Sequence, residues 1–552
     1  MVHLLIREKS LGSRPLLKNF ELRLADGEKL GFIGRNGSGT TTVFRILCGE
    51  DSDFDGDIRV PSTQTMLATS QEHHHVNNQT VRAYITSRLP DFTRLKTLID
   101  ELPHTMGENA RKQAEFADAL ELFSTRGYYD IENEIESYFD DYQLSPTLLD
   151  QPFPTLSGGQ KRLVDLVAIQ IANPSIALLD EPTNHMDFIA KEKFIAWLKS
   201  TDSDCVVISH DRDVLQAVDR IVELKDTTLY SYPGNYDAYI AQNSTKTVGA
   251  MQGYESTEKR IENLRDQIRF ANAKARSQAG QQTGRSGKNK WVVLRDRYEK
   301  ELEHTMATHK KPEFWIDQDS ANKLPPKITE KYEKYKAKNI RLHRPQDRSH
   351  GLLLQVEKLS LGYDARPLFE NLSFDLRGGE KLHIVGRNGA GKTTLVRAIF
   401  DTVNGIHPST VIGKGLITPA PALSVRVYEQ ELARDLLEKT LFDSIEQSLR
   451  ERDIPAHEQA VRAVLAQYLF DPIEDATKPV SLLSGGQKAR LQLIRLLIGN
   501  PGLLILDEPT NHLDLPSIEE LEKALSTFSG AILYISHDSY FARNLGGVSI
   551  RL

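Results

Sequence analysis

Two glycine-rich segments of the chain have the residue types and spacing of loops that hold phosphate groups. The second reads Gly386-Arg-Asn-Gly-Ala-Gly-Lys392-Thr, and the first reads Gly34-Arg-Asn-Gly-Ser-Gly-Thr40-Thr. Glycines let backbone N–H groups close around phosphate oxygens, and the start of a helix adds its positive dipole. Lys392 can neutralise the β- and γ-phosphates, whereas Thr40 stands at the equivalent place in the first loop. The two loops are therefore predicted to differ in how strongly they hold phosphate.

Each half of the chain also carries an apolar strand that ends in two acids, Asp180-Glu181 and Asp507-Glu508. A buried strand delivers such side chains to the carboxyl edge of an open α/β sheet, where nucleotides bind. The aspartate suits a Mg²⁺ shell, and the glutamate suits polarising an attacking water. One such strand is usually just a strand that leaves the core. Two copies, each followed by Pro-Thr-Asn-His, favour the chemical interpretation.

An internal repeat relates the two halves. Ser157, Asp180 and His210 each have a residue of the same type 327 positions later. The glycine loops are 352 positions apart, so the first half is 25 residues longer between its loop and Ser157. We expect the extra residues near 88–125, where apolar spacing predicts two short amphipathic helices.

A basic segment separates the halves. The net charge of the chain is −7, yet residues 241–350 hold 24 Lys and Arg against 14 Asp and Glu. Residues 254–279 are predicted to form a long helix, several glycines interrupt it, and helical spacing resumes from Trp291 to about His309. Such a basic helical hairpin suits contact with a polyanion. A solvated linker that only spaces two domains is the alternative.

Length and composition narrow the class of protein. A chain of 552 residues suggests several domains. Its apolar runs are shorter than the roughly 20 residues of a membrane span, and its first residues lack the pattern of a secretory signal. Cys48 and Cys205 lie far apart, which argues against disulfides and against zinc or iron–sulfur sites. A cytoplasmic location is expected.

The Leu-Ser-Gly-Gly-Gln sequences at 156–160 and 483–487 resemble the signature of ATP-binding-cassette (ABC) ATPases. Together with the glycine loops and the acid pairs, they extend this resemblance over both halves. Tandem cassettes joined by a charged helical segment resemble the ABC-F subfamily. The resemblance implies an α/β fold with two tandem P-loop ABC ATPase domains, at 1–240 and 351–552, joined by a long helical hairpin linker at 241–350.

In that family ATP is sandwiched between the phosphate loop of one half and the signature of the other. For the site with the complete loop, the resemblance implies these ATP ligands: Gly386, Asn388, Gly389, Gly391, Lys392, Thr393, Thr394 and Tyr363, facing Ser157, Gly158, Gly159 and Gln160. The Mg²⁺ ligands implied there are Thr393, Gln430 and Asp507, and the catalytic residues are Glu508, His537 and Gln430.

For the other site, the implied ATP ligands are Gly34, Asn36, Gly37, Gly39, Thr40, Thr41 and Thr42, facing Ser484, Gly485, Gly486 and Gln487. The implied Mg²⁺ ligands are Thr41, Gln71 and Asp180, and the catalytic residues are Glu181, His210 and Gln71. Thr40 departs from the family pattern, and so does Leu11, which aligns with Tyr363, where the family stacks an aromatic ring on adenine. Two departures favour a naturally weakened site that hydrolyses ATP to ADP and phosphate slowly. A single altered residue at Thr40 is the alternative.

The resemblance also implies a partner. ABC-F members bind the ribosomal E site and push the linker towards P-site tRNA. A ribosome-bound ATPase, in contact with rRNA and tRNA and closing both ATP sites within one monomer, is therefore expected, and the long hairpin favours the branch that displaces ribosome-targeting antibiotics. The alternatives are a housekeeping ABC-F translation factor and the ATP-binding subunit of a membrane transporter. A DNA-repair ATPase is a weaker alternative, because zinc cysteines and a far longer coiled coil are absent.

Overall fold

The structure is a computed structural model of the 552-residue chain. It describes residues 2–12, 14–35, 37–61, 64–69, 79–105, 107, 109–184, 186–225, 227–278, 290–308, 351–363, 366–406, 411–428, 432–468, 470–483, 485–511 and 513–552. The chain divides into two compact units, Met1–Tyr236 with Ile340–Leu552, and Asp237–Asn339. The first unit contains both repeated halves, and the second contains the helical segment between them.

The first half is built on two sheets. Six strands form the larger sheet in the order β5-β6-β7-β3-β8-β9, and three form an antiparallel sheet in the order β2-β1-β4. The larger sheet is parallel except where β9 pairs with β8. The strands are β1 (Val2–Leu11), β2 (Arg14–Leu24), β3 (Lys29–Gly34), β4 (Asp55–Arg59), β5 (Met66–Ala68), β6 (Ile176–Asp180), β7 (Asp204–Ile208), β8 (Arg220–Lys225) and β9 (Thr228–Pro233).

Among the described residues, the second half repeats this topology except for a counterpart of β9. Its parallel sheet has the order β14-β15-β16-β12-β17, and its antiparallel sheet has the order β11-β10-β13. The strands are β10 (Leu352–Tyr363), β11 (Arg366–Arg377), β12 (Lys381–Val385), β13 (Val411–Pro419), β14 (Val425–Tyr428), β15 (Leu503–Asp507), β16 (Ala531–Ile535) and β17 (Val548–Arg551). The phosphate-loop strand and the acid-bearing strand take the same places in both sheets, which confirms the predicted α/β fold with two repeated domains.

Four pairs of helices repeat between the halves. They are α1 (Thr40–Leu47) and α13 (Lys392–Val403), α6 (Gly158–Ala172) and α17 (Gly485–Leu497), α7 (Phe188–Ser200) and α18 (Leu515–Ser526), and α8 (Arg212–Leu215) and α19 (Ser539–Leu545). Because α1 and α13 begin directly after the glycine loops, each loop lies at a helix N-terminus.

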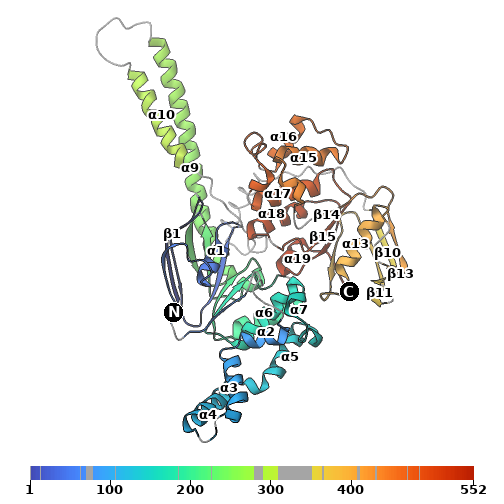
Figure 1. The fold of residues 1–552 in the computed structure, drawn as a ribbon. Helices are drawn as coiled ribbons and strands as arrows, with labels where there is room; N and C mark the ends of the chain where they lie inside the picture. Colours follow the sequence, from blue (N-terminus) through green and yellow to red (C-terminus); the bar gives the residue numbers. More distant parts are fainter. Residues whose placement is uncertain are drawn as a thin grey trace. The chain divides into compact units, whose positions relative to one another are not determined.

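The remaining helices of the two halves do not match one for one. In the first they are α2 (Val81–Ser87), α3 (Phe92–Thr105), α4 (Ala110–Thr125) and α5 (Ile131–Asp141), and in the second α14 (Arg434–Leu437), α15 (Leu441–Arg450) and α16 (Glu458–Gln467). The helices α3 and α4 occupy the segment where extra residues were expected (Figure 1). Their aromatic cluster joins Phe92, Phe123 and Tyr128, with ring centroids 5.2–5.6 Å apart.

The second unit contains two long helices, α9 (Tyr236–Gln278, which begins one residue before the unit) and α10 (Lys290–Thr308). They lie side by side (Figure 1), joined by an ion pair from Arg260 to Glu301 at 2.6 Å and by an edge-to-face contact of Phe270 with Trp291. The helix α9 begins 18 residues before the expected start at 254, so it runs through the expected domain boundary at 240.

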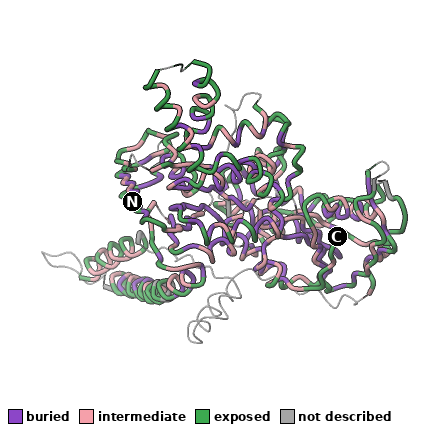
Figure 2. The backbone as a smooth tube through the Cα atoms, turned by 90° about the horizontal axis from the view of Figure 1, so that it is seen from below, coloured by how far each residue is buried: buried purple, intermediate pink, exposed green. Residues whose placement is uncertain are grey.

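Buried residues concentrate along the strands of the first unit, whereas α9 and α10 carry mostly exposed and partly exposed positions (Figure 2). In the first half one apolar cluster joins both sheets to α1 through residues such as Leu4, Phe20, Phe32 and Phe44. An equivalent cluster in the second half joins its sheets to α13. Each phosphate loop is thus held by the packing of a strand, a helix and a second sheet.

Candidate functional site

Each phosphate loop passes into its helix through a glycine in the left-handed region. Gly39 and Gly391 cap α1 and α13 with φ of 112° and 95°. A Cβ atom at Gly391 would lie 3.1 Å from the Leu368 side chain, and one at Gly39 would lie 2.9 Å from that of Leu16. Glycine is therefore required here by both backbone conformation and space.

The side chain of Lys392 occupies the second loop. Its ammonium donates to the carbonyls of Gly386 and Arg387 at 2.8 and 3.0 Å. Burial lowers the Lys392 pKa, while the nearby Glu508, Asp187 and Asp507 carboxylates raise it. In the first loop, the Thr40 methyl group lies 2.7 Å from where a Cβ atom on Gly34 would be. Thr40 packs against its own loop and adds no charge.

The second site brings Glu508 and His537 together. A carboxylate oxygen of Glu508 lies 3.2 Å from His537 Nε2, and the other oxygen accepts from the His537 backbone N–H at 3.2 Å. Burial and the Asp507 charge raise the Glu508 pKa to about 7, although the His537 N–H and Lys392 oppose the rise. Burial, with a contribution from Lys392, lowers the His537 pKa to about 4. A carboxylate that titrates near neutral pH suits a general base.

The first site has the same pair in a looser arrangement. His210 Nε2 lies 3.8 Å from a Glu181 oxygen. Burial and the Asp180 charge raise the Glu181 pKa to about 8, and burial lowers the His210 pKa. The predicted acid and histidine therefore lie together in both halves, with closer contact in the second.

Both glutamates have a left-handed backbone, with φ of 46° at Glu181 and 47° at Glu508. This conformation is uncommon for residues other than glycine, and its retention at two equivalent positions is typical of strain held at functional sites. The backbone N–H of each glutamate donates to the end of a neighbouring strand, at Ile208 or Ile535. The conformation turns each chain sharply as it leaves β6 or β15.

Oxygen donors suited to Mg²⁺ meet beside Lys392. The Thr393 hydroxyl forms a side-chain hydrogen bond with Asp507, which lowers the Asp507 pKa against the larger effect of burial. Magnesium binds few protein ligands and keeps water and phosphate oxygens, so a hydroxyl and a carboxylate in contact fit the ion. Among the described residues, no cluster of three or more His, Cys, Asp or Glu side chains offers a metal site made by the protein alone.

The signature of the first half starts α6. Ser157 caps this helix and accepts from the Gln160 N–H at 3.3 Å, and the Gln160 side chain accepts from the Ser157 N–H at 3.0 Å. These reciprocal bonds form a capping box, which fixes the first turn and leaves the glycines between them open to a ligand. A Cβ atom at Gly158 would meet nothing within 4 Å.

A cavity of about 1160 Å³ joins this signature to the second phosphate loop. Its lining from the second half includes Tyr363, Asn388, Gly389, Gly391, Lys392, Thr393, Thr394, Asp507, Glu508 and His537. From the first half it includes Thr40, Thr41, Ser157, Gly159, Gln160, Asp180, Glu181 and His210. The Asn388 N–H donates to Asp187 of the first half at 3.3 Å. The structure therefore brings together most of the residues predicted for the complete site.

Other predicted residues are not joined to this cavity. Gly34, Gly37, Gly39 and Thr42 belong to the first loop and its helix, and Gly386 begins the second loop, but these five do not line the cavity. Gly485 and Gly486 begin α17, and Gln487, which follows them, does not line the cavity. Tyr363 is 54% exposed and lines the cavity, whereas Leu11 is 58% exposed and does not. Asn36, Gln71, Gln430 and Ser484 lie outside the described residues.

Residues that sequence reasoning did not select also connect the halves. Lys191 of α7 donates to the His537 carbonyl at 2.7 Å, and Ser539 donates to Asp213 at 2.6 Å. The buried Arg212 pairs with Glu522 at 2.8 Å. The repeat gave no signal for Lys191, because the equivalent position is Ile518. A lysine on a helix is ordinarily a solvent-facing residue.

Both halves of the chain match a known protein family. A family profile described as ABC transporter matches residues 17–184 and 369–511, more than half of the chain. A second profile with the same description matches residues 222–288, which include all of α9. None of the helices that the structure describes combines the length and apolarity needed to span a membrane.

Similar proteins extend along nearly the whole chain. The ATP-binding protein YdiF of Bacillus subtilis (strain 168) is 30% identical over 551 residues, which cover 97% of this chain and 77% of YdiF. The ATP-binding protein Uup of Escherichia coli (strain K12) is 28% identical, with 97% and 77% covered. ABC transporter F family member 5 of Arabidopsis thaliana is 26% identical, with 97% and 72% covered.

Solved structures share the fold at lower identity. The RNase-L Inhibitor matches with a TM-score of 0.58 at 16% identity, covering 99% of this chain and 87% of that one. An archaeal ribosome recycling factor, solved with a ribosomal stalk protein, matches with a TM-score of 0.57 at 15% identity and the same coverage. With two cassettes matched by profile and relatives matched from end to end, the chain belongs to the ABC transporter family and is an ABC-F-type ATPase.

Proposed function

We propose that this ATPase acts on the ribosome, with the α9–α10 hairpin as the part that reaches towards P-site tRNA. The observation that carries the proposal is a long, charged helical pair between two ATPase domains. A helix of 43 residues rises roughly 64 Å. The helices are held to each other by the Arg260–Glu301 ion pair and the Phe270–Trp291 contact, so the pair can act as one semi-rigid arm. The similarity in fold to a ribosome recycling factor supports a ribosomal partner.

Charge favours RNA as the surface that this hairpin meets. Residues 241–350 have an excess of basic side chains, while the whole chain has a net charge of −7. Phosphate contacts by Lys and Arg release counterions, so an RNA contact made by this segment would weaken as salt is added. A ribosomal partner makes the cytoplasm the expected location.

Sedimentation with ribosomes tests the proposal. The Glu181→Gln/Glu508→Gln double variant is expected to bind ATP, remain closed and pellet with ribosomes, and to pellet much less with ADP. The wild-type chain with ATP, which can hydrolyse the nucleotide and dissociate, serves as the comparison. Recovery of the double variant with membranes in place of ribosomes would favour a transporter subunit and refute the ribosomal function.

We further propose that the ribosomal action displaces antibiotics bound near the peptidyl-transferase centre or exit tunnel. A hairpin that approaches P-site tRNA would come close to that region. Expression in a susceptible host is expected to raise tolerance to such a drug without lowering its concentration in the cell. Lower drug accumulation would indicate transport, and unchanged tolerance to every drug of this group would indicate a housekeeping translation factor.

The two ATP sites are proposed to be unequal. The support is the neutral Thr40 side chain against the buried ammonium of Lys392, together with Leu11 in place of the cavity-lining Tyr363. The first site keeps Glu181, Asp180 and His210, so it retains the residues to bind Mg²⁺-ATP and hydrolyse it slowly. We expect it to serve mainly as a clamp, with most turnover at the site of Lys392.

A further inference from the structure

Lys191 is a buried cation beside the second ATP site but belongs to the first half. It lies in the first turn of α7, four residues after the helix cap Asp187, and is only 3% exposed. Lysine is seldom buried, because removing an ammonium from water is costly unless it is paired. Neither phosphate binding nor the signature accounts for its position.

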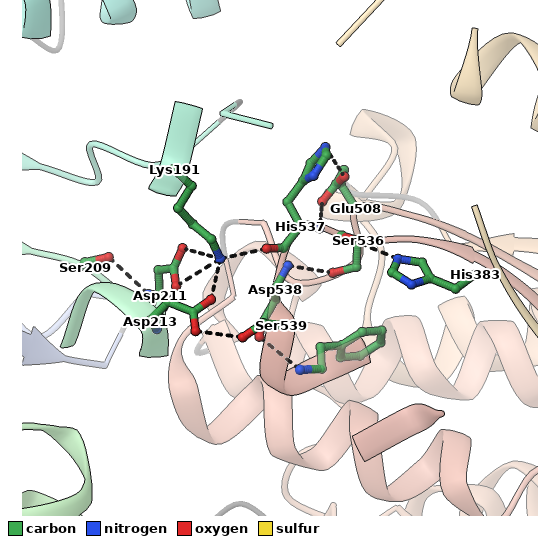
Figure 3. Close-up of polar contacts among 11 residues, drawn as sticks. Lys191, Ser209, Asp211, Asp213, His383, Glu508, Ser536, His537, Asp538 and Ser539 are labelled. Atoms are coloured by element: carbon green, nitrogen blue, oxygen red, sulfur yellow. Dashed lines mark hydrogen bonds and ion pairs between the residues drawn. The ribbon is translucent and has the colours of Figure 1, made fainter. Parts of the chain in front are cut away.

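The contacts of Lys191 explain its burial. Its Nζ atom lies 2.6 Å from a carboxylate oxygen of Asp213 and 3.3 Å from one of Asp211, and it donates to the His537 carbonyl at 2.7 Å (Figure 3). An ammonium group has three N–H donors, and Lys191 has one acceptor for each of them. The Asp211 and Asp213 charges hold the Lys191 pKa above its usual value despite the opposing effect of burial. Lys191 is therefore charged at neutral pH.

Two of those partners lie in the first half and the third in the second. His537, whose carbonyl accepts from Lys191, uses its backbone N–H to hold Glu508 at 3.2 Å. Its imidazole approaches the same carboxylate at 3.2 Å. Ser539 adds a second link, because its hydroxyl donates to Asp213 at 2.6 Å (Figure 3). The segment that holds Glu508 is thus tied to α7 and α8 of the other half.

The internal repeat has no second copy of the bond from Lys191 to the His537 carbonyl. The residue that corresponds to Lys191 in the second half, 327 positions later, is Ile518. Isoleucine has no hydrogen-bond donor, so it cannot hold the His210 carbonyl in the same way. The looser pair at the first site, where His210 and Glu181 are 3.8 Å apart, agrees with the missing link.

We propose that Lys191 is a positioning residue for ATP hydrolysis at the site of Lys392, through which the first half holds His537 and Glu508 in their reactive arrangement. Lys191 acts on the reacting groups only through the His537 peptide and through its charge. Opening of the halves would break the bond to the His537 carbonyl and release the Glu508 side chain. Hydrolysis at this site is thereby limited to the closed arrangement. The inference rests on ATP turnover at the Lys392 site and is independent of the ribosomal partner.

The test compares steady-state ATP hydrolysis by full-length Lys191→Met and Lys191→Arg variants. Methionine keeps the apolar length of the side chain and removes the charge and the donors. We expect kcat to fall about tenfold, which corresponds to about 1.4 kcal/mol, with KM for ATP changed less than about twofold. Lys191→Arg keeps the charge and should recover much of the activity.

Lys193→Met is the matched control, because Lys193 lies on the same helix but is exposed and forms its ion pair with Asp141, within the first half. It should keep the wild-type kcat and the wild-type KM for ATP. Normal kcat in Lys191→Met would overturn the inference, and so would a loss of kcat that came with an equal weakening of ATP binding and was not recovered by arginine. A wild-type chain without ATP turnover would overturn the assigned activity as well.

Discussion

Restoring lysine at position 40 should strengthen the first phosphate loop. In the second loop, the Lys392 ammonium is held by the carbonyls of Gly386 and Arg387 at 2.8 and 3.0 Å. The first loop has the same residue types at Gly34 and Arg35, so a lysine introduced at 40 would find equivalent acceptors. Its charge would then be available to the β- and γ-phosphates, which the threonine hydroxyl can neither reach nor neutralise.

The size of the effect follows from the cost of one charged hydrogen bond. Such a bond is worth about 1.5–3 kcal/mol, and about 1.4 kcal/mol corresponds to a tenfold change in binding. The Thr40→Lys variant should therefore bind ATP at its first site roughly ten to a hundred times more tightly than the wild-type chain. Backbone N–H groups and Thr41 remain in both, so the difference isolates the ammonium.

A set of four full-length chains measures this effect cleanly. Titration with a fluorescent ATP analogue would compare the wild type, Thr40→Lys, Lys392→Thr and the double variant that exchanges the two residues. Thr40→Lys should create a second tight site, and Lys392→Thr should remove the existing one. The double variant should regain one tight site. Equal affinities for wild type and Thr40→Lys would refute the reasoning and show that another group supplies the missing charge.

Three further predictions concern adenine, protonation and RNA. Tyr363→Ala should weaken ATP binding several-fold by loss of stacking, on the order of 1 kcal/mol, whereas Leu11→Ala should have little effect; equal changes in nucleotide titrations would contradict the assigned asymmetry. Since the Glu508 pKa is raised to about 7, its base form is lost as pH falls through 7, so kcat should decline between about pH 8 and 6, and a flat profile would exclude Glu508 as the titrating base. Alanine in place of three basic residues near the hairpin tip should weaken ribosome binding and reduce its salt dependence, measured by sedimentation at several salt concentrations; unchanged binding would make the segment a spacer. Those residues are Arg285, Lys288 and Lys290. Of the three, Arg285 and Lys288 lie outside the described residues.

Much of the fold could be predicted because local chemistry and overall topology agree. The segments around Gly34 and Gly386 join an apolar strand, a glycine loop and a helix start, and the structure has β3–α1 and β12–α13 there. Strands β6 and β15 are continuous apolar runs, as expected for the centre of a parallel sheet, and the acids at their ends meet the histidines from neighbouring strands.

The start of α9 was predicted too late for a local reason. Gly249 and Gly253 each reduce helix propensity by about 1 kcal/mol, so the pattern indicated a helix from 254 onwards. The structure continues the helix through both glycines from Tyr236. Intrinsic propensity is a weak guide where a helix extends from an ordered domain, since the first turn is already formed and only propagation is needed.

The role of Lys191 could not be predicted from sequence, because it depends on contact between residues 346 positions apart. Helical periodicity places Lys191 on α7 but says nothing of the His537 carbonyl beside it. The left-handed backbone of Glu181 and Glu508 gave no signal either, since glutamate has no preference for that conformation. Tertiary packing imposes both features.

The unequal division of ATP turnover between the two sites is tested most directly by comparing kcat of Glu508→Gln and Glu181→Gln in the full-length chain. Glutamine keeps the shape of each side chain and removes the base. The Glu508→Gln variant should lose most ATP hydrolysis, because Glu508 lies close enough to the Lys392 ammonium for that charge to lower its pKa, whereas the loop that serves Glu181 carries the neutral Thr40. Glu181→Gln should retain most of it. Equal losses in the two variants, or a greater loss in Glu181→Gln, would contradict the assignment of turnover to the Lys392 site.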